Sequence, residues 1–143
     1  MPAKMSIVTG LAHIGIRVHD LARARAFYEL LGFEHTLGPF GPEQVTIFEH
    51  PAGLEINLIV NAAQSAESNV LMDIPEKHAG YTHIALSVRD LGEVQSLLER
   101  AGYAISEGPV TFPNGTRAIF VRDPDRNVVE LDEHAPSKAS DAK

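Results

Sequence analysis

The stretch that decides the fold is Tyr81-Thr82-His83-Ile84-Ala85-Leu86-Ser87-Val88-Arg89-Asp90-Leu91. Its apolar residues alternate as in a half-buried strand, and Asp90 near its end is a residue type favoured at the N-cap of a helix. A closely similar stretch, Leu11-Ala12-His13-Ile14-Gly15-Ile16-Arg17-Val18-His19-Asp20-Leu21, occurs 70 residues earlier. Both stretches therefore predict a strand that leads into a helix, and both carry a histidine at the same point.

The repeat continues beyond these two stretches. The offset of 70 residues is kept by the pairs Asp20/Asp90, Gly32/Gly102, Gly38/Gly108 and Pro39/Pro109. Pro124 then corresponds to Pro51 at an offset of 73, and we match Glu130 to Glu55 at an offset of 75, which predicts about three extra residues in one hairpin loop and two in the next turn. Each copy has the pattern strand, helix, strand, strand, strand, as expected of a duplicated supersecondary unit. The sequence thus predicts an α+β fold of two tandem βαβββ modules.

The length of 143 residues suits one domain, or two small modules with a common core. We expect an N-terminal lead (1–10), a first module (11–60), a linker without clear periodicity (61–80), a second module (81–133) and a flexible tail (134–143).

Composition excludes several kinds of partner and site. The net charge of −7 argues against nucleic acid and against an anionic membrane surface as partners. No signal peptide or membrane-spanning segment is visible. The sequence contains no cysteine, which rules out disulfides and thiolate metal ligands and suits a reducing compartment such as the cytoplasm.

Four residues are candidates for a metal site. Strand alternation puts His13, Glu55, His83 and Glu130 on the sheet faces opposite the helices. Two neutral imidazoles and two carboxylates suit a divalent ion such as Ni, Zn, Co, Mn or Fe. Arg17, Asn57 and Ser87 lie further along the same faces and are weaker candidates for a substrate pocket.

At this level of detail the sequence resembles the vicinal oxygen chelate superfamily, which contains glyoxalases, bleomycin-resistance proteins and extradiol dioxygenases. The resemblance covers residues 11–133 and is carried by the two histidine stretches and by Phe27-Tyr28, Leu31-Gly32-Phe33, Gly108-Pro109, Asp123-Pro124-Asp125 and Val129-Glu130-Leu131. It implies that the sheets of the two modules form an open, barrel-like cleft. It also implies metal ligands on the first and last strands of each module, matched here to the same two histidines and two glutamates.

The ligand set resembles that of bacterial glyoxalase I most closely. The implied function is a metal-dependent lyase or isomerase in which Glu130 or Glu55 moves a proton between adjacent carbons of a small-molecule substrate. The alternatives are an Fe(II) extradiol-type dioxygenase with two histidines and one glutamate, an acyl-CoA epimerase, and a metal-free binding protein of the bleomycin-resistance type.

Two further expectations concern glutathione and assembly. Glyoxalase I enzymes hold glutathione with basic residues and an asparagine, but Ala79 and Ile59, where we look for such residues, do not match. Residues that could replace them are Asn57, Asn61, Arg17, Arg117 and Arg122. We expect a homodimer because unpaired sheet edges otherwise stay exposed, and the site could lie within one chain or between two.

Overall fold

A computed structural model describes residues 7–136 of the chain. Its elements are β1 (Ile14–Arg17), α1 (Leu21–Leu30), β2 (Glu34–Phe40), β3 (Val45–His50), β4 (Leu54–Ile59), β5 (His83–Ser87), α2 (Leu91–Arg100), β6 (Ile105–Thr111), β7 (Arg117–Arg122) and β8 (Val128–Glu133). The predicted α+β fold of two βαβββ modules is confirmed. The predicted lead (1–10) and tail (134–143) lie largely outside the described residues. No helix in the described part of the chain is long and apolar enough to cross a membrane.

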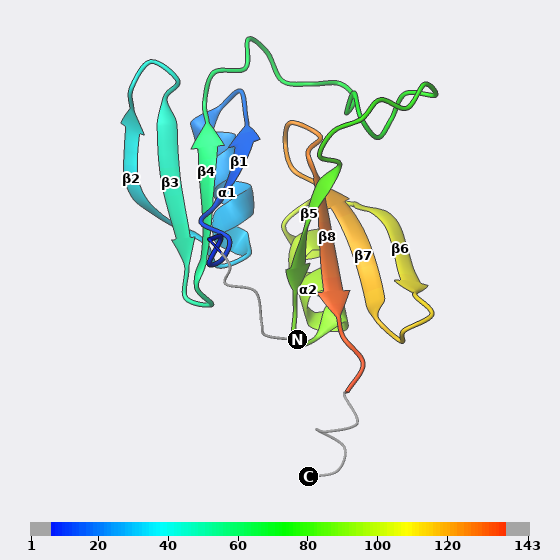
Figure 1. Ribbon diagram of the computed structural model, residues 1–143. Coiled ribbons are helices and arrows are strands. Elements are labelled where there is room, and N and C mark those ends of the chain that lie inside the picture. The colour runs from blue at the N-terminus through cyan, green and yellow to red at the C-terminus, as the bar shows by residue number, and fades with distance from the viewer. Residues whose placement is uncertain (1–6, 137–143) are drawn as a thin grey trace.

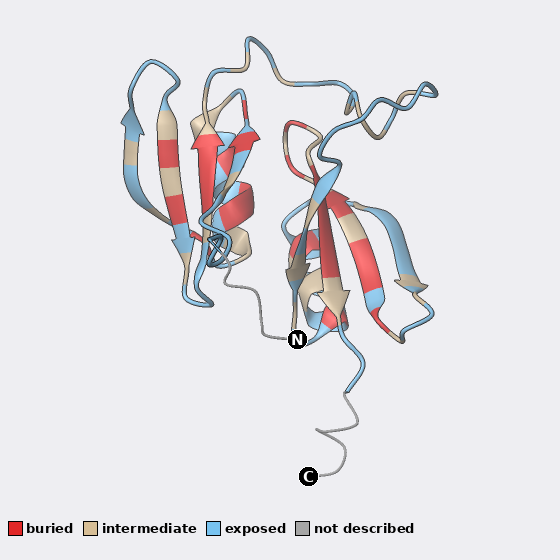
Figure 2. Cartoon of the chain, in the orientation of Figure 1, coloured by how far each residue is buried: buried red, intermediate tan, exposed pale blue. Residues whose placement is uncertain are grey.

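The two modules form two separate four-stranded sheets. The strand orders are β1-β4-β3-β2 and β5-β8-β7-β6, with one parallel pair in each sheet. The sheets stand side by side with β1 and β5 at their facing edges, and both helices lie behind them (Figure 1). The outer strands β2 and β6 are mostly exposed, whereas the central strands are largely buried (Figure 2). The sheets do not close into a barrel, as expected for an open cleft.

Each helix begins at the predicted aspartate. The side chain of Asp20 accepts a hydrogen bond from the backbone N–H of Arg23 at 3.0 Å, and Asp90 accepts one from Glu93 at 2.9 Å. These bonds satisfy backbone donors that have no partner within the helix. The repeated aspartate therefore fixes where both helices start.

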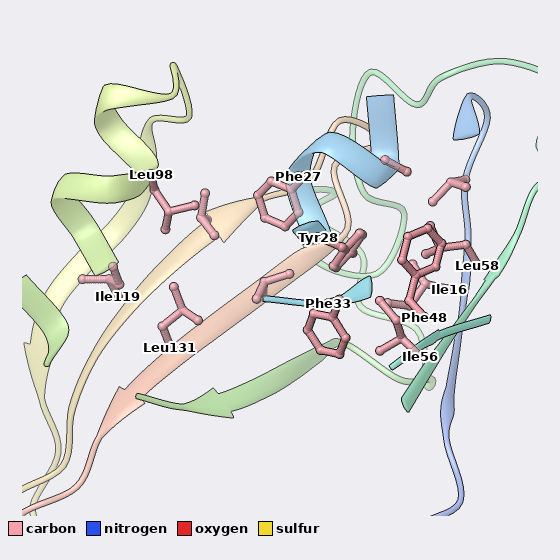
Figure 3. Packing of buried hydrophobic residues seen from close by; sticks show 14 of the residues in the cluster. Ile16, Phe27, Tyr28, Phe33, Phe48, Ile56, Leu58, Leu98, Ile119 and Leu131 are labelled. Carbon is pink, nitrogen blue, oxygen red and sulfur yellow. The ribbon is translucent and has the colours of Figure 1, made fainter. Parts of the chain in front are cut away.

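One hydrophobic core joins the two modules on the helix side of the sheets (Figure 3). The ring of Phe27 in α1 packs edge-on against Tyr103 of the second module, with 4.9 Å between centroids. Next to it the buried Tyr28 hydroxyl donates a hydrogen bond to Asp123 Oδ2 at 2.8 Å. Asn127 adds a second link by donating to the backbone oxygen of Arg17 at 3.2 Å. The modules are thus held together behind the sheets, which leaves the helix-free faces open.

The strand register corrects one sequence prediction. In the first module Gly15 lies opposite Asn57, and in the second module Ala85 lies opposite Glu130. Gly15 and Ala85 are counterparts in the repeat, so the counterpart of Glu130 is Asn57, at an offset of 73 residues. The prediction that Glu55 is the counterpart of Glu130 is therefore wrong.

The reason lies in the turn before the last strand of each module. The N–H of Gly53 bonds to the oxygen of His50, and the N–H of Arg126 bonds to the oxygen of Asp123, both at 2.9 Å. Gly53 and Arg126 both have positive φ angles, of 85° and 68°. The two turns have the same length, so the two extra residues predicted there do not exist, whereas the three predicted in the earlier hairpin loop do.

Candidate metal and substrate site

The second module presents one histidine–glutamate pair on its helix-free face. His83 Nε2 lies 2.9 Å from Glu130 Oε1, and the Nδ1 atom of the same ring lies 2.8 Å from the Thr82 hydroxyl. The ring of Phe120 on β7 packs edge-on against the imidazole, with 6.1 Å between centroids. The contacts with Glu130, Thr82 and Phe120 hold the His83 ring in place. The His83 side chain is 31% exposed and the Glu130 side chain is 10% exposed.

Glu130 is the most perturbed acid on this face. Burial raises the pKa of Glu130 to about 7, with further contributions from Asp132, which shares a hydrogen bond with it, and from the negative charge of Glu107. A carboxyl group that titrates near neutral pH suits both the uptake and the release of a proton. The side chain is therefore the strongest candidate for acid–base chemistry in the described residues.

The first module presents a looser pair. His13 Nδ1 lies 3.7 Å from Glu55 Oε2. The Asn57 amide lies between them: oriented to satisfy both neighbours, it accepts a hydrogen bond from His13 Nε2 at 3.1 Å and donates one to Glu55 Oε2 at 3.0 Å. Both Glu55 and Asn57 thus lie beside the histidine, although only Asn57 occupies the position that Glu130 occupies in the second module.

The corrected register moves the position at which the asparagine of a glutathione site is expected. Ile59 lies four residues after Glu55, whereas Asn61 lies four residues after Asn57. Asn61 Oδ1 accepts a hydrogen bond from Arg17 Nε at 2.9 Å, and its amide nitrogen bonds to Glu43. The terminal nitrogens of the Arg17 guanidinium have no partner among the described residues, so they are free to bind an anion.

Ser87, which the sequence predicts as a pocket residue, lies beside His134. Its hydroxyl lies 3.0 Å from His134 Nε2, and the other ring nitrogen of His134 lies 3.4 Å from the Thr116 hydroxyl. Ser87 pairs with Asp132 on β8, and Asp132 lies two residues after Glu130 on the same face of the sheet. Ser87 therefore lies on the predicted face, but its hydroxyl is within hydrogen-bond distance of His134.

The two histidine–carboxylate pairs are not brought together within this chain. Among the described residues no group of three or more His, Asp or Glu side chains is close enough to hold a metal ion. A cavity of about 250 Å³ is lined by His83 and Arg17, and a second cavity of about 200 Å³ is lined by His13, Glu55 and Ala85. Imidazole and carboxylate donors suit a divalent ion, but each pair supplies only two such side chains.

Two contributors to this surface are missed by sequence reasoning, the ring of Phe120 against His83 and the carboxylate of Glu43 bonded to Asn61. Asn57 is predicted only as a pocket residue, not as the counterpart of Glu130. The offset of 73 between Pro51 and Pro124 is the sequence signal that could have identified Asn57 and, through it, Asn61.

Comparison with known proteins agrees with this architecture. The model of the Glyoxalase/Bleomycin resistance protein/Dioxygenase superfamily matches residues 10–131. A curated relative, the glyoxalase domain-containing protein RDO1 of Mycosarcoma maydis, is 26% identical over 142 residues, which cover 92% of this chain and 72% of the relative.

Solved structures show the same fold at low sequence identity. The fosfomycin resistance protein FosX of Listeria monocytogenes is 22% identical with a TM-score of 0.69, over 95% of this chain and 98% of that one. A glyoxalase family protein from Enterococcus faecalis is 23% identical with a TM-score of 0.74, over 90% of this chain and 100% of that one. From the match to the family model, which spans most of its length, we conclude that the chain belongs to the Glyoxalase/Bleomycin resistance protein/Dioxygenase superfamily.

Proposed function

We propose that this protein is a metal-dependent lyase or isomerase of the glyoxalase type, which moves a proton between adjacent carbons of a small substrate that has two vicinal oxygens. The observation that carries the proposal is the pair of histidine–glutamate contacts, His83–Glu130 at 2.9 Å and His13–Glu55 at 3.7 Å, on the helix-free faces of the two sheets. The two histidines are counterparts in the repeat, and a carboxylate beside each of them suits a metal site better than unrelated surface contacts do.

The proposed ligands are His13, His83 and Glu130, with Glu55 or the Asn57 oxygen in a fourth position. This set suits Ni, Zn, Co, Mn or Fe. A bound ion would supply Lewis-acid stabilisation of a developing oxyanion on the substrate.

The carboxylates supply the proton transfer. In the metal-free protein, burial raises the pKa of Glu130 to about 7, and as a ligand it would act on a proton only after its carboxylate leaves the ion. Glu55 receives a hydrogen bond from the Asn57 amide, which holds it beside His13. If Asn57 and not Glu55 completes the ligand set, Glu55 remains available as a general base.

The substrate carries an anionic group in this proposal. Arg17 is oriented by Asn61, which is in turn held by Glu43, so the guanidinium is held in place before an anion arrives. A basic residue next to an asparagine is the combination with which glyoxalase I enzymes hold glutathione. We therefore propose a glutathione conjugate, or another anionic thiol adduct, as the first substrate class to test.

The complete site requires both pairs, and we propose that it forms in a homodimer in which each ligand set combines residues of two copies. The absence of a complete set within the described part of one chain and the exposed outer strands support this arrangement. The absence of cysteine supports a cytoplasmic location.

One observation favours a second candidate. Asn57, an amide, occupies the position where a fourth carboxylate ligand would lie, which leaves two histidines and one glutamate. This three-residue set is typical of non-haem Fe(II) oxygenases. An extradiol-type dioxygenase is therefore the alternative, and iron-dependent oxygen uptake on a catechol would identify it. An amide in place of one carboxylate also occurs in acyl-CoA epimerases, which are a variant of the first proposal.

The test is metal reconstitution followed by an assay of proton transfer. Metal-free protein is loaded with each of the five ions and assayed on a hemithioacetal of glutathione and on an acyl-CoA. We expect about one ion per chain and an activity that Glu130→Gln abolishes. His78→Ala is the matched control, because His78 forms an exposed pair with Glu76 at 3.8 Å outside the proposed site. Absence of bound metal, with Glu130→Gln behaving as wild type, would refute the proposal and leave the metal-free binding protein as the better account.

A further inference from the structure

Arg122 lies on the same helix-free face as His83 and Glu130. His83 pairs with Val128 on β8, and Val128 pairs with Arg122 on β7, so the three residues form one row across the sheet. Neighbouring strands are about 4.8 Å apart, which puts the Cα atoms of His83 and Arg122 about 10 Å apart. A small molecule bound at His83 therefore lies within reach of the Arg122 side chain.

The guanidinium of Arg122 already holds a carboxylate. Its two terminal nitrogens each donate to one oxygen of Asp73, both at 2.7 Å. This fork-to-fork geometry is the one with which arginine binds a free carboxylate or phosphoryl group. Arg126 approaches the same carboxylate at 3.6 Å, and Glu107 on β6 adds a negative charge that acts on Arg122. Asp73 thus occupies a preformed position for an oxyanion.

The two arginines have unused donors. The Nε atoms of Arg122 and Arg126 are buried, and neither has a hydrogen-bond partner among the described residues. A phosphoryl group has three acceptor oxygens, one more than the carboxylate of Asp73, and could bind the terminal nitrogens of both arginines at once.

Asp73 comes from the linker, which contains neither helix nor strand between Ile59 and His83. It closes a short turn with Asn69, whose N–H donates to Asp73 Oδ2 at 2.7 Å. The turn also lines the cavity of about 250 Å³, through Asn69 and the two residues that follow it, together with Arg17 and His83. Residues 69–73 of the linker therefore bind Arg122, through Asp73, and also line the cavity beside His83. Long connections without secondary structure in compact domains are commonly lids or binding loops.

We propose that Arg122 binds an anionic group of the substrate, a carboxylate or a phosphoryl group, and that Asp73 of the linker occupies Arg122 until that group displaces it. This inference rests on the proposed function, since it takes the cavity beside His83 as the substrate site. An intramolecular carboxylate competes at a high effective concentration. A ligand that also binds the metal or Arg17 can displace Asp73, whereas a ligand that contacts Arg122 alone cannot. The linker therefore selects for anionic substrates long enough to contact both places.

The test uses inorganic phosphate and metal-free full-length protein, so that it does not depend on the metal site. Phosphate binding is measured by calorimetry for wild type, Asp73→Asn, and Asp73→Asn combined with Arg122→Gln. We expect Asp73→Asn to bind phosphate at least about ten-fold more tightly than wild type, and the double variant to lose this gain. Glu29→Gln is the matched control, because Glu29 forms an exposed pair with Arg25 at 3.1 Å far along the sequence from the linker.

Equal phosphate affinity in wild type and Asp73→Asn would overturn the proposal and make the ion pair a purely structural clamp. A gain that persists after Arg122→Gln would also overturn it, because another residue would then bind the anion. If Asp73→Asn does not fold, Asp73→Glu keeps the charge but changes the geometry, and it must show a smaller gain of the same sign. The metal content of His83→Ala is measured separately, so that failure of the metal proposal and failure of the anion site can be told apart.

Discussion

The hydrogen bond between Tyr28 and Asp123 is a buried polar contact between the two modules. Tyr28 is 1% exposed and Asp123 is 2% exposed, and the two residues come from different modules. Tyr28→Phe removes the hydroxyl and leaves the ring, which still packs edge-on against Phe27 and Phe33. The substitution therefore tests the hydrogen bond separately from the hydrophobic packing.

The expected loss follows from the remaining partners of Asp123. Its carboxylate still accepts bonds from the N–H groups of Asp125 and Asn127 and from the Asn127 amide, at 2.8–2.9 Å. The Asp123 carboxylate therefore loses one hydrogen bond and keeps three. A hydrogen bond to a charged group contributes about 1.5–3 kcal/mol. We expect the free energy of unfolding to fall by about 2 kcal/mol, with a drop in Tm of about 4–8 °C for a chain of this size.

Urea denaturation followed by circular dichroism measures this loss. Tyr103→Phe is the control, because the Tyr103 hydroxyl makes no hydrogen bond with a described residue although its ring also packs on Phe27. We expect Tyr103→Phe to change the free energy of unfolding by less than about 0.5 kcal/mol. Equal losses in the two variants would refute the claim that the Tyr28–Asp123 bond holds the modules together.

Three further predictions concern the site and the linker. If the ligand sets are shared between two copies, a refolded mixture of His13→Ala and His83→Ala regains about a quarter of the wild-type metal content; no recovery would show that each site lies within one chain. Because burial raises the pKa of Glu130 to about 7, against about 4.3 in an unfolded chain, ionisation of Glu130 destabilises the metal-free fold as pH rises through that range. Glu130→Gln should therefore gain stability relative to wild type between pH 4 and pH 8 in urea titrations, and a constant difference would contradict this. The Arg122 guanidinium holds the pKa of the Asp73 carboxyl well below its usual range, so this pair stabilises the fold at neutral pH and loses its effect as pH falls below about 4. Asp73→Asn should thus be less stable than wild type at pH 7, and the Tm difference should become smaller, without vanishing, when the pH is lowered to 3, because the paired carboxyl is still ionised there.

The repeat in the sequence was sufficient to predict the modules. Strand alternation and the repeated aspartate caps are local signals, and the structure reproduces both. The same signals could not decide between Glu55 and Asn57, because residues two apart on a strand point to the same face. The register is fixed by the turn, in which Arg126 adopts the positive φ that Gly53 adopts in the first module. A non-glycine residue in that conformation gives no clear signal in the sequence.

The packing of the two modules against each other was even harder to predict from the sequence. Alternation predicts which face His13 and His83 share with their carboxylates, but the distance between the two pairs depends on how the modules pack. That packing is set by long-range contacts such as Phe27–Tyr103 and Tyr28–Asp123. The pairing of Asp73 with Arg122 likewise joins residues 49 apart, from a segment that has no periodic pattern. Such contacts follow from the tertiary fold, and no local pattern encodes them.

The central claim is that the two histidine–carboxylate pairs contribute to one metal site. It is tested most directly by the metal stoichiometry of wild type, His13→Ala and His83→Ala after reconstitution, measured by inductively coupled plasma mass spectrometry. A single shared set predicts about one ion per wild-type chain and loss of nearly all bound metal in either variant. If the two variants each kept half of the metal, the pairs would bind ions independently, and the claim of one shared site would be contradicted.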